Sequence, residues 1–330
     1  MEDSFDVVTM GSATQDVFVK TEAETIKLCN HNQCEELLAY PLGSKILIKE
    51  LDYHIGGGGT NTATTFARQG LKTGWLGKLG RDSAGLAVHK FLKQEGVAFL
   101  GSVGSKTGYS VILDSEADDR TILTYKGANS TLTLASVGKL LDTLTARWLY
   151  CSSLLDESYK TMMAVMRHLK RRGSRLAFNP SSYQAEQGLE KLSPVLKLLD
   201  VLILNKEEAQ LLTKTKVNDS RKLLKLLRQA GPDIVVITDG AHGAHVLADR
   251  YLFTGVTPDC EVVETTGAGD AFASGFVAYL VRNKSIREAL LAGMLNAEHV
   301  VAHLGAKNDI LKALKLDILV SQDKREIVEE

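Results

Sequence analysis

The sequence has no long hydrophobic run, and no apolar stretch reaches the roughly 18 residues that a membrane-spanning helix needs. The N-terminus also lacks a basic segment followed by an apolar one, so it carries no recognisable export signal. We therefore expect a cytoplasmic protein without a membrane partner.

An excess of either charge is also missing. The 39 lysines and arginines are balanced by 40 aspartates and glutamates, which leaves a net charge of −1. Without a basic excess the chain would displace few counterions from a phosphate backbone, which argues against nucleic acid as its main partner. We interpret the basic run Lys170–Arg172 as a solvated helix end.

The four cysteines are too few and too scattered for a disulfide scaffold. Cys29 and Cys34 flank His31, a spacing that is compatible with part of a zinc site. Because no second pair of ligands follows, we expect ordinary thiols.

Short apolar runs alternate with longer periodic ones along most of the chain. Runs typical of buried strands occupy residues 5–10, 74–79, 148–152, 175–178, 201–204 and 234–238. Helical patterns between several of them cover residues 83–95, 158–172, 207–213 and 220–230. Repeated strand–helix–strand units predict an α/β fold with a mainly parallel sheet covered on both faces. Ligands of such sheets bind beyond the carboxyl ends of the strands.

Two segments, at about 16–55 and 106–126, interrupt this alternation with β-branched residues and turn-like breaks. Within the second segment, residues 109–113 and 121–125 predict a hairpin around residues 115–119. Taken by themselves, both segments are typical of surface hairpins.

The most informative stretch runs from Glu264 to Gly275. Apolar residues after Phe272 recur at three to four positions, so a helix is predicted to begin near Gly267. The free amides of its first turn and the helix dipole stabilise anionic oxygens, and glycines at 267 and 269 let a ligand approach the backbone. Asp270 would repel phosphate, so we interpret it as a base for a hydroxyl group. The alternative is an ordinary cap and turn.

A second glycine cluster reads Gly56-Gly57-Gly58-Gly59-Thr60-Asn61. It follows a strand-like segment that ends at Ile55 and precedes a helical face with Ala63 and Phe66. Four successive glycines indicate that something approaches the backbone closely.

Together the two clusters resemble the paired signatures of the PfkB carbohydrate kinase family, the ribokinase-like kinases. The N-terminal signature, GG-x-x-x-N and then G-x-D-x-x-G, is matched by Gly56–Asn61 and Gly80–Gly85. The C-terminal signature, D-T-x-G-A-G-D, is matched by Glu264–Asp270, with Glu264 in place of the usual Asp. The resemblance covers essentially the whole chain. It implies one ribokinase-like domain at 1–330, a three-layer α/β fold, and a small β-sheet lid formed from the insertions at about 16–55 and 106–126.

For the substrate, the resemblance implies contacts from Asp16, Gly57, Gly58 and Asn61. A carboxylate, an amide and closely packed main chain suit a polyol. Gly58 stands where many ribokinases have Lys, which leaves the identity of the sugar open.

For the metal, Asn205 and Glu208 match an N-x-x-E element that organises magnesium in this family, with Glu208 acting through water. Oxygen ligands of this kind suit a hard cation that keeps much of its hydration. The same four residues are also typical of a helix start.

For the nucleotide, the resemblance implies contacts from Asn205 and from the T-x-G-x-x-G element at Thr238, Gly240 and Gly243, and it places Asn296 near the adenine. Asp239-Gly240 is also a strong turn dipeptide, so this element has a purely structural interpretation as well.

The implied reaction is in-line transfer of the ATP γ-phosphoryl group to an alcohol. Asp270 serves as base, the amides of Gly267, Ala268 and Gly269 form the anion hole, and magnesium bridges the phosphates. No P-loop pattern G-x-x-x-x-G-K-[ST] occurs, so the amides carry more of the charge stabilisation, with Lys206 as a candidate helper.

Three functions stay open: a sugar kinase, which we favour, a nucleoside kinase of the adenosine type, and a sugar-sensing protein without catalysis. Intact Asp270 with both glycine loops argues against the last. Aromatic residues of the lid segments could stack a base or pack the sheet: Phe18, Tyr40, Tyr53, Tyr109 and Tyr125. A potassium site and a homodimer through edge strands of the lid are further open possibilities.

Overall fold

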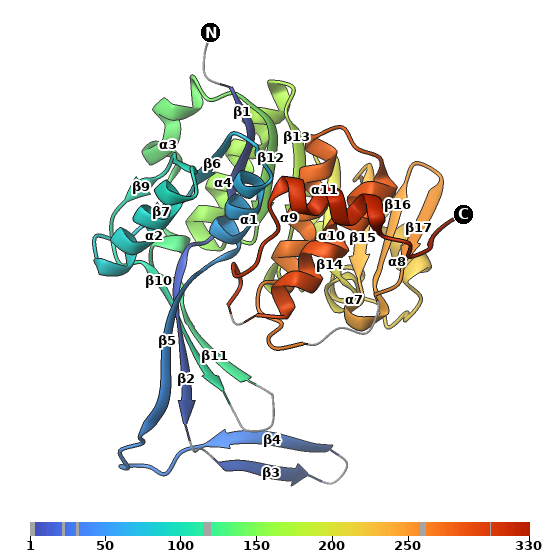
Figure 1. Ribbon diagram of the computed structural model, residues 1–330. Helices are drawn as coiled ribbons and strands as arrows, with labels where there is room; N and C mark the ends of the chain where they lie inside the picture. Colours follow the sequence, from blue (N-terminus) through green and yellow to red (C-terminus); the bar gives the residue numbers. More distant parts are fainter. Residues whose placement is uncertain (1–3, 22–23, 31–32, 115–119, 258–261, 304) are drawn as a thin grey trace.

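A ten-stranded sheet forms the centre of the computed structural model, which describes residues 4–21, 24–30, 33–114, 120–257, 262–303 and 305–330 (Figure 1). Its strand order is β18-β17-β16-β15-β14-β13-β12-β1-β6-β8. All pairs from β15 to β8 are parallel, and β16, β17 and β18 complete one edge in antiparallel fashion. The strands are β1 (Phe5–Met10), β6 (Thr73–Leu76), β8 (Ala98–Phe99), β12 (Ala146–Ser152), β13 (Arg175–Asn179), β14 (Val201–Asn205), β15 (Ile234–Thr238), β16 (Ala244–Ala248), β17 (Tyr251–Gly255) and β18 (Ile327–Glu329).

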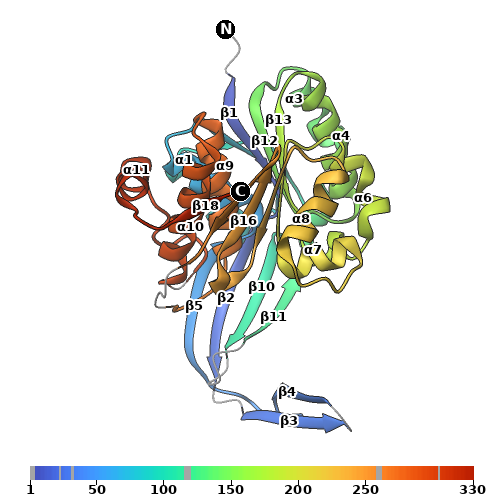
Figure 2. The ribbon, with the colours of Figure 1, turned by 90° about the vertical axis from the view of Figure 1, so that its right-hand side faces the viewer.

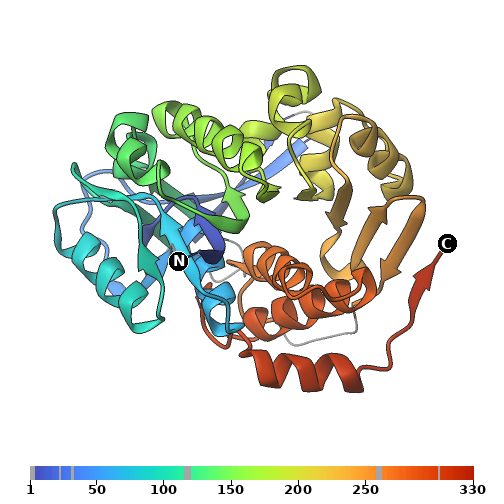
Figure 3. The same cartoon turned by 90° about the horizontal axis from the view of Figure 1, so that it is seen from above.

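Helices cover both faces of this sheet (Figures 2 and 3). One face carries α1 (Gly58–Arg68), α9 (Ala268–Val281), α10 (Ile286–Val301) and α11 (Ala313–Gln322). The other carries α3 (Leu134–Leu141), α4 (Asp156–Arg171), α6 (Gly188–Leu196), α7 (Lys206–Thr213) and α8 (Ser220–Gln229). Successive strand residues point to opposite faces, so Val7 packs with the α9 and α10 cluster and Val8 with the α4 cluster. The predicted three-layer α/β fold is confirmed.

The remaining helical segments are short or lie near the sheet edge. α2 (Ser83–Gln94) contributes Val88 and Leu92 to a third core cluster around Trp75. The others are α5 (Ser182–Ala185) and the 3₁₀ turns η1 (Gly127–Ser130) and η2 (Gly240–His242).

A second, four-stranded sheet with the order β11-β10-β2-β5 lies at the end of the main body (Figure 1). It consists of β2 (Thr14–Thr21), β5 (Ile48–Gly56), β10 (Gly108–Asp114) and β11 (Arg120–Tyr125). The predicted hairpin is confirmed, because Tyr109 pairs with Tyr125 in antiparallel register. Its predicted turn at 115–119 lies outside the described residues. Two-stranded sheets are formed by β3 (Glu24–Asn30) with β4 (Gln33–Ala39) and by β7 (Lys78–Leu79) with β9 (Ser102–Val103).

The expectation of free thiols at Cys29 and Cys34 is wrong. The two residues stand directly opposite each other in the β3–β4 register and form a disulfide. No group of three or more His, Cys, Asp or Glu within the described part of the chain is arranged to hold a metal ion. His31 lies outside the described residues. The described helices also include none that is long and apolar enough to cross a membrane.

Candidate active site

The two glycine clusters meet at the carboxyl ends of β1 and β12, where α1 and α9 begin. Asn61 Nδ2, in the first turn of α1, donates a 2.7 Å hydrogen bond to Asp270 Oδ2, in the first turn of α9. A Cβ on Gly58 would lie 3.3 Å from Asp270 Oδ1. Sequence positions more than 200 residues apart are therefore brought together, as the paired motifs predict.

Asp16 reaches the same place from β2. A Cβ on Gly56 would lie 1.7 Å from Asp16 Oδ2, so only glycine leaves room for this carboxylate. Gly57 has φ 93°, a conformation that favours glycine, and a Cβ there would lie 2.5 Å from the carbonyl oxygen of Ser12. The glycines thus let the loop between β5 and α1 press against the end of β1.

The environment of Asp270 suits a base. Burial raises the pKa of Asp270, whereas the hydrogen bond from Asn61 and the positive charge of Lys307 lower it. Its Oδ2 is held by Asn61, and its Oδ1 accepts no hydrogen bond from any described residue. One carboxylate oxygen is therefore anchored, and the other can accept a proton.

Lys307, which the sequence analysis did not single out, completes this cluster. Its side chain is buried, and its Nζ donates to Asn61 Oδ1 and to the carbonyl oxygen of Ile55. Because Asn61 Oδ1 accepts from Lys307, the amide nitrogen of Asn61 must face Asp270. Burial lowers the pKa of Lys307 to about 7, and the charges of Asp16 and Asp270 oppose that shift.

The start of α9 provides amides for an anion, with one correction. Gly267 is the N-cap with φ 83°, and the amides of Gly267 and Gly269 donate to no described residue. The amide of Ala268, however, donates to the carbonyl oxygen of Thr265 at 3.2 Å, so it is not free for an anion hole. The amide of Asp270 has no such partner among the described residues.

Glu264 holds the loop in front of α9. Its Oε1 accepts from the amide of Thr266 at 2.9 Å, and its Oε2 accepts from the amide of Gly305 at 3.1 Å. The longer side chain at this position therefore ties the α9 loop to the segment that carries Lys307.

Several buried polar atoms near Asp270 lack a partner. Asp16 Oδ1, Tyr150 Oη and Ser152 Oγ make no hydrogen bond with the described part of the chain. Burial raises the pKa of Tyr150, and the charges of Asp270 and Glu208 add to that shift. Unpaired buried polar atoms are costly, and a bound alcohol or water can supply the missing partners.

Asn205 and Thr238, which are predicted to contact the nucleotide, end two adjacent strands and stand opposite each other in the β14–β15 register. Asn205 and Glu208 also form a capping box, in which each side chain accepts from the other's backbone amide. The helix-start interpretation of N-x-x-E is thus confirmed.

The donor set fits a magnesium ion that keeps its water. Burial raises the pKa of Glu208 to about 7, and the nearby charge of Asp270 adds to the shift. Two carboxylates that disfavour each other's ionisation are stabilised by a hard cation. Because the described residues offer no cluster of three such ligands, water and phosphate oxygens would have to complete the coordination.

The loop after β15 is built as a turn. Gly243 has φ 92°, and a Cβ there would lie 2.0 Å from the carbonyl oxygen of Gly255, whereas the surroundings of Gly240 are open. Lys206 is paired with Asp239 at 2.8 Å, so its charge is already partly neutralised.

The structure contradicts a direct adenine contact from Asn296. This side chain has no exposed surface, donates to the carbonyl oxygen of Ala271 at 2.8 Å, and accepts from the amide of Leu311 at 3.1 Å. Both polar atoms of its amide are used, so it positions the first turn of α9.

Comparisons with known proteins agree with this geometry. The family model of the pfkB family carbohydrate kinases matches residues 19–313. The chain is 28% identical over 263 residues to a ribokinase of Haemophilus influenzae, covering 77% of this chain and 83% of that protein. It is 24% identical over 286 residues to a 5-dehydro-2-deoxygluconokinase of Halalkalibacterium halodurans, covering 82% of this chain and 86% of that protein.

Solved structures show the same fold. A ribokinase of Arabidopsis thaliana, complexed with ribose and ATP, aligns with a TM-score of 0.79 at 21% identity and covers 97% of this chain and 100% of its own. An adenosine kinase of Sinorhizobium meliloti aligns with a TM-score of 0.78 at 21% identity and covers 97% of this chain and 99% of its own.

Proposed function

Because the chain belongs to the pfkB family of carbohydrate kinases, we propose that it transfers the γ-phosphoryl group of ATP to an alcohol group of a small sugar or sugar-like substrate. The observation that carries this proposal is the carboxylate of Asp270, anchored by Asn61 at 2.7 Å beside the glycine loop. A base next to free amides at a helix start is what transfer to a hydroxyl group needs.

In the proposed reaction, Asp270 Oδ1 accepts the proton of the substrate hydroxyl. The hydroxyl oxygen forms a bond to the γ-phosphorus while the bond from that phosphorus to the bridging oxygen breaks, and ADP leaves. The amides of Gly267 and Gly269 stabilise the transferring oxygens. Glu208, through water, and Asn205 would hold magnesium, which supplies neutralisation of the phosphate charge.

We assign the substrate to the region between Asp16, Gly57, Gly58 and Asn61, and the nucleotide to the region around Thr238, Gly240 and Gly243. The partnerless oxygens of Asp16 and Ser152 support a polyol at the first region, because its hydroxyl groups would supply the missing hydrogen bonds.

The second candidate, a nucleoside kinase, gains little from the aromatic residues of the lid segments. Phe18 is buried and packs edge-on against His54, with ring centroids 5.3 Å apart. Tyr40 shares a hydrogen bond with Thr21, and the side chain of Tyr53 is exposed. These contacts favour packing of the sheet over stacking of a base, so we prefer a sugar.

The β11-β10-β2-β5 sheet is proposed as the lid of a single kinase domain spanning 1–330. Its hairpin extension exposes apolar side chains at Ile26, Leu28 and Leu37, which would support a homodimer through the lid. Light scattering after size-exclusion chromatography tests the dimer, and a monomer at all concentrations would rule it out. We also propose a cytoplasmic location, because the reaction consumes ATP.

The function is tested by ADP release with magnesium and ATP across neutral sugars, sugar acids, sugar phosphates and nucleosides. We expect turnover with a sugar or sugar derivative, and a nucleoside as the best acceptor would replace the first candidate by the second. Replacing potassium by sodium in the same assay tests for a monovalent activator. Absence of ADP release with every acceptor would favour a sensing protein.

A further inference from the structure

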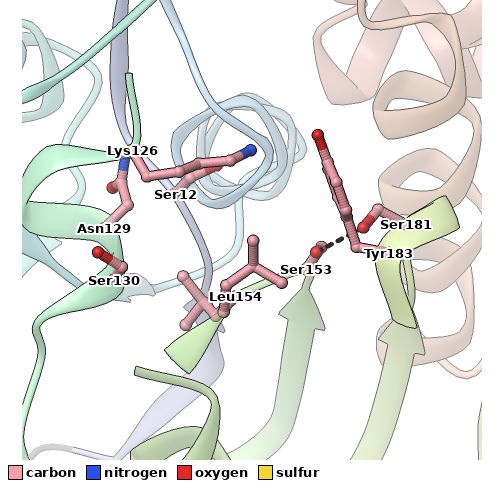
Figure 4. Close-up of a pocket in the computed structure, with 9 residues that line it drawn as sticks. Ser12, Lys126, Asn129, Ser130, Ser153, Leu154, Ser181 and Tyr183 are labelled. Atoms are coloured by element: carbon pink, nitrogen blue, oxygen red, sulfur yellow. Dashed lines mark hydrogen bonds between the residues drawn. The ribbon is translucent and has the colours of Figure 1, made fainter. Parts of the chain in front are cut away.

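The main body of the protein contains a cavity of about 220 Å³, and Figure 4 shows the side chains that line it. Its lining comes from segments that follow strands, with the side chains of Ser12, Lys126, Ser130, Ser153, Ser181 and Tyr183 among them. Ser153 follows Ser152, whose Oγ would lie 2.9 Å from a Cβ on Gly58. Because Gly58 is also next to Asp270, the cavity begins close to the place where the reacting hydroxyl would sit.

Lys126 supplies the only charge among the described residues that line this cavity. Figure 4 shows Lys126 and Tyr183 extending from opposite sides, and Lys126 Nζ is 5.1 Å from the centroid of the Tyr183 ring. The ammonium group of Lys126 forms no ion pair or hydrogen bond with any residue that the structure describes. Burial lowers the pKa of Lys126, which reflects an ammonium group that has lost water without gaining an anion.

The remaining polar groups leave room for an anion. Asn129 is fixed by bonds to the backbone of Ala13, and Ser153 bonds to Ser181 and to Gln184. The described lining contains no carboxylate that could repel an anionic group or neutralise Lys126. A neutral sugar would leave this half-buried ammonium unpaired, whereas a carboxylate or phosphate would form a charge-assisted hydrogen bond with it.

We propose that this cavity binds an anionic group of the phosphoryl acceptor, a carboxylate or a phosphate, and that the substrate is therefore an acidic sugar derivative and not a neutral sugar. The inference rests on the proposed function, because it assumes that the acceptor hydroxyl lies at Asp270. It adds Lys126 as the residue that discriminates between acidic and neutral acceptors.

The test compares kcat/KM for three groups of acceptors: D-gluconate and 2-keto-3-deoxy-D-gluconate, D-fructose 1-phosphate and D-ribose 5-phosphate, and neutral D-fructose and D-ribose. We expect a carboxylate or a phosphate acceptor to exceed the neutral ones by about 10-fold or more, as one charge-assisted hydrogen bond allows. The anionic group that gives the higher kcat/KM, carboxylate or phosphate, is the one that the cavity binds. A neutral sugar as the best acceptor would overturn the proposal.

Substitution of Lys126 separates its charge from other effects. Lys126→Met should lower the ratio of kcat/KM for the acidic over the neutral acceptor by about 10-fold or more, mainly through KM, and Lys126→Arg should retain most of the ratio. Lys139→Met removes the same charge from an exposed position on α3 and should leave the ratio unchanged. An unchanged ratio in Lys126→Met would contradict the assignment.

A binding measurement keeps this inference apart from the proposed function. Calorimetric titration of the same acids into Asp270→Asn reports binding without turnover. If the acids bind tightly and Lys126→Met weakens that binding, the anion site is supported, even when no acceptor is phosphorylated. A lack of phosphorylation would then count only against the kinase reaction. Binding of the acids that is no tighter than binding of the neutral sugars would overturn the anion site even if neutral sugars are phosphorylated.

Discussion

Lys307 connects three parts of the molecule through one side chain. It binds the amide of Asn61, which holds Asp270, and the backbone of Ile55 at the end of β5. Asn61 alone could present either its oxygen or its nitrogen to Asp270, and only the nitrogen favours the carboxylate. The contact with Lys307 therefore orients the amide so that its nitrogen faces Asp270.

Lys307→Met is expected to lower kcat by about 10-fold or more, because Asn61 loses the partner that orients it and Asp270 loses a nearby positive charge. The measurement is steady-state kinetics with magnesium and ATP. Lys307→Arg keeps the charge, so its kcat should lie between that of the wild type and that of Lys307→Met. A Lys307→Met enzyme with the kcat of the wild type would show that the amide is oriented without this lysine.

The same lysine predicts a pH dependence of stability. Its pKa is about 7 in the folded protein and near 10.5 when unfolded, so between these pH values the unfolded chain binds more protons. Stability of the wild type relative to Lys307→Met should therefore rise as pH increases from about 7 to 10, by on the order of 1–4 kcal/mol. Denaturant unfolding of both proteins at several pH values measures it. A difference in unfolding free energy between the two proteins that stays constant from about pH 7 to 10 would contradict this prediction.

The sequence was sufficient to expect Asp270, Asn61 and the glycines around them at one place, because these residues belong to contiguous motifs. It did not predict Lys307 or Tyr150, whose roles depend on contacts with distant segments and leave no local pattern. The sequence also did not show that Asn296 is buried, because its place in the core is set by packing between α9 and α10.

The start of α9 contains two glycines, and packing requires only one of them. A Cβ on Gly267 would lie 2.4 Å from the Cβ of Ala306, whereas a Cβ on Gly269 would meet nothing within 4 Å. Gly267 is thus required by the fold, and Gly269 has no packing reason to be glycine. Close approach of a phosphate would explain it.

Gly269→Ala should therefore reduce kcat/KM for ATP by about 10-fold or more without loss of stability, because the added Cβ would keep the phosphate away from the amides of this turn. Thermal unfolding and kinetics measure the two effects. Gly138→Ala in α3 is the matched control, because a Cβ there also meets nothing within 4 Å; it should be active and slightly stabilised. Full activity of Gly269→Ala would remove this glycine from the phosphate site.

Elements with strong local patterns were predicted well, and those defined by their neighbours were not. β1 and β15 have the predicted bounds, whereas the predicted strand at 74–79 is divided into β6 and β7. α6 was not predicted: it begins at Gly188, which has φ 80°, and contains Pro194. Both residues are typical of helix ends, so tertiary packing overrides the local signal there.

The architecture joins the proposed lid directly to the residues around Asp270. β2 carries Asp16, and β5 ends at the glycine loop and gives the carbonyl oxygen of Ile55 to Lys307 (Figure 1). A shift of the four-stranded sheet would therefore move groups that contact the base. Closure over the substrate would also exclude water from the transfer step.

Hydrogen–deuterium exchange can detect this closure. Adding the best acceptor together with a non-hydrolysable ATP analogue should slow amide exchange in β5 and β10 more than in the outer helix α8, because only the lid strands gain protection on closing. Equal protection in α8, or none in the lid, would indicate a sheet that does not close over the site.

The account depends most on Asp270 as the base, and turnover of Asp270→Asn with magnesium, ATP and the best acceptor tests it most directly. The substitution keeps the shape of the side chain but cannot accept the proton, so kcat should fall by about 10²–10⁴-fold while ATP affinity stays nearly unchanged. An Asp270→Asn enzyme that retains most of its turnover would contradict the account.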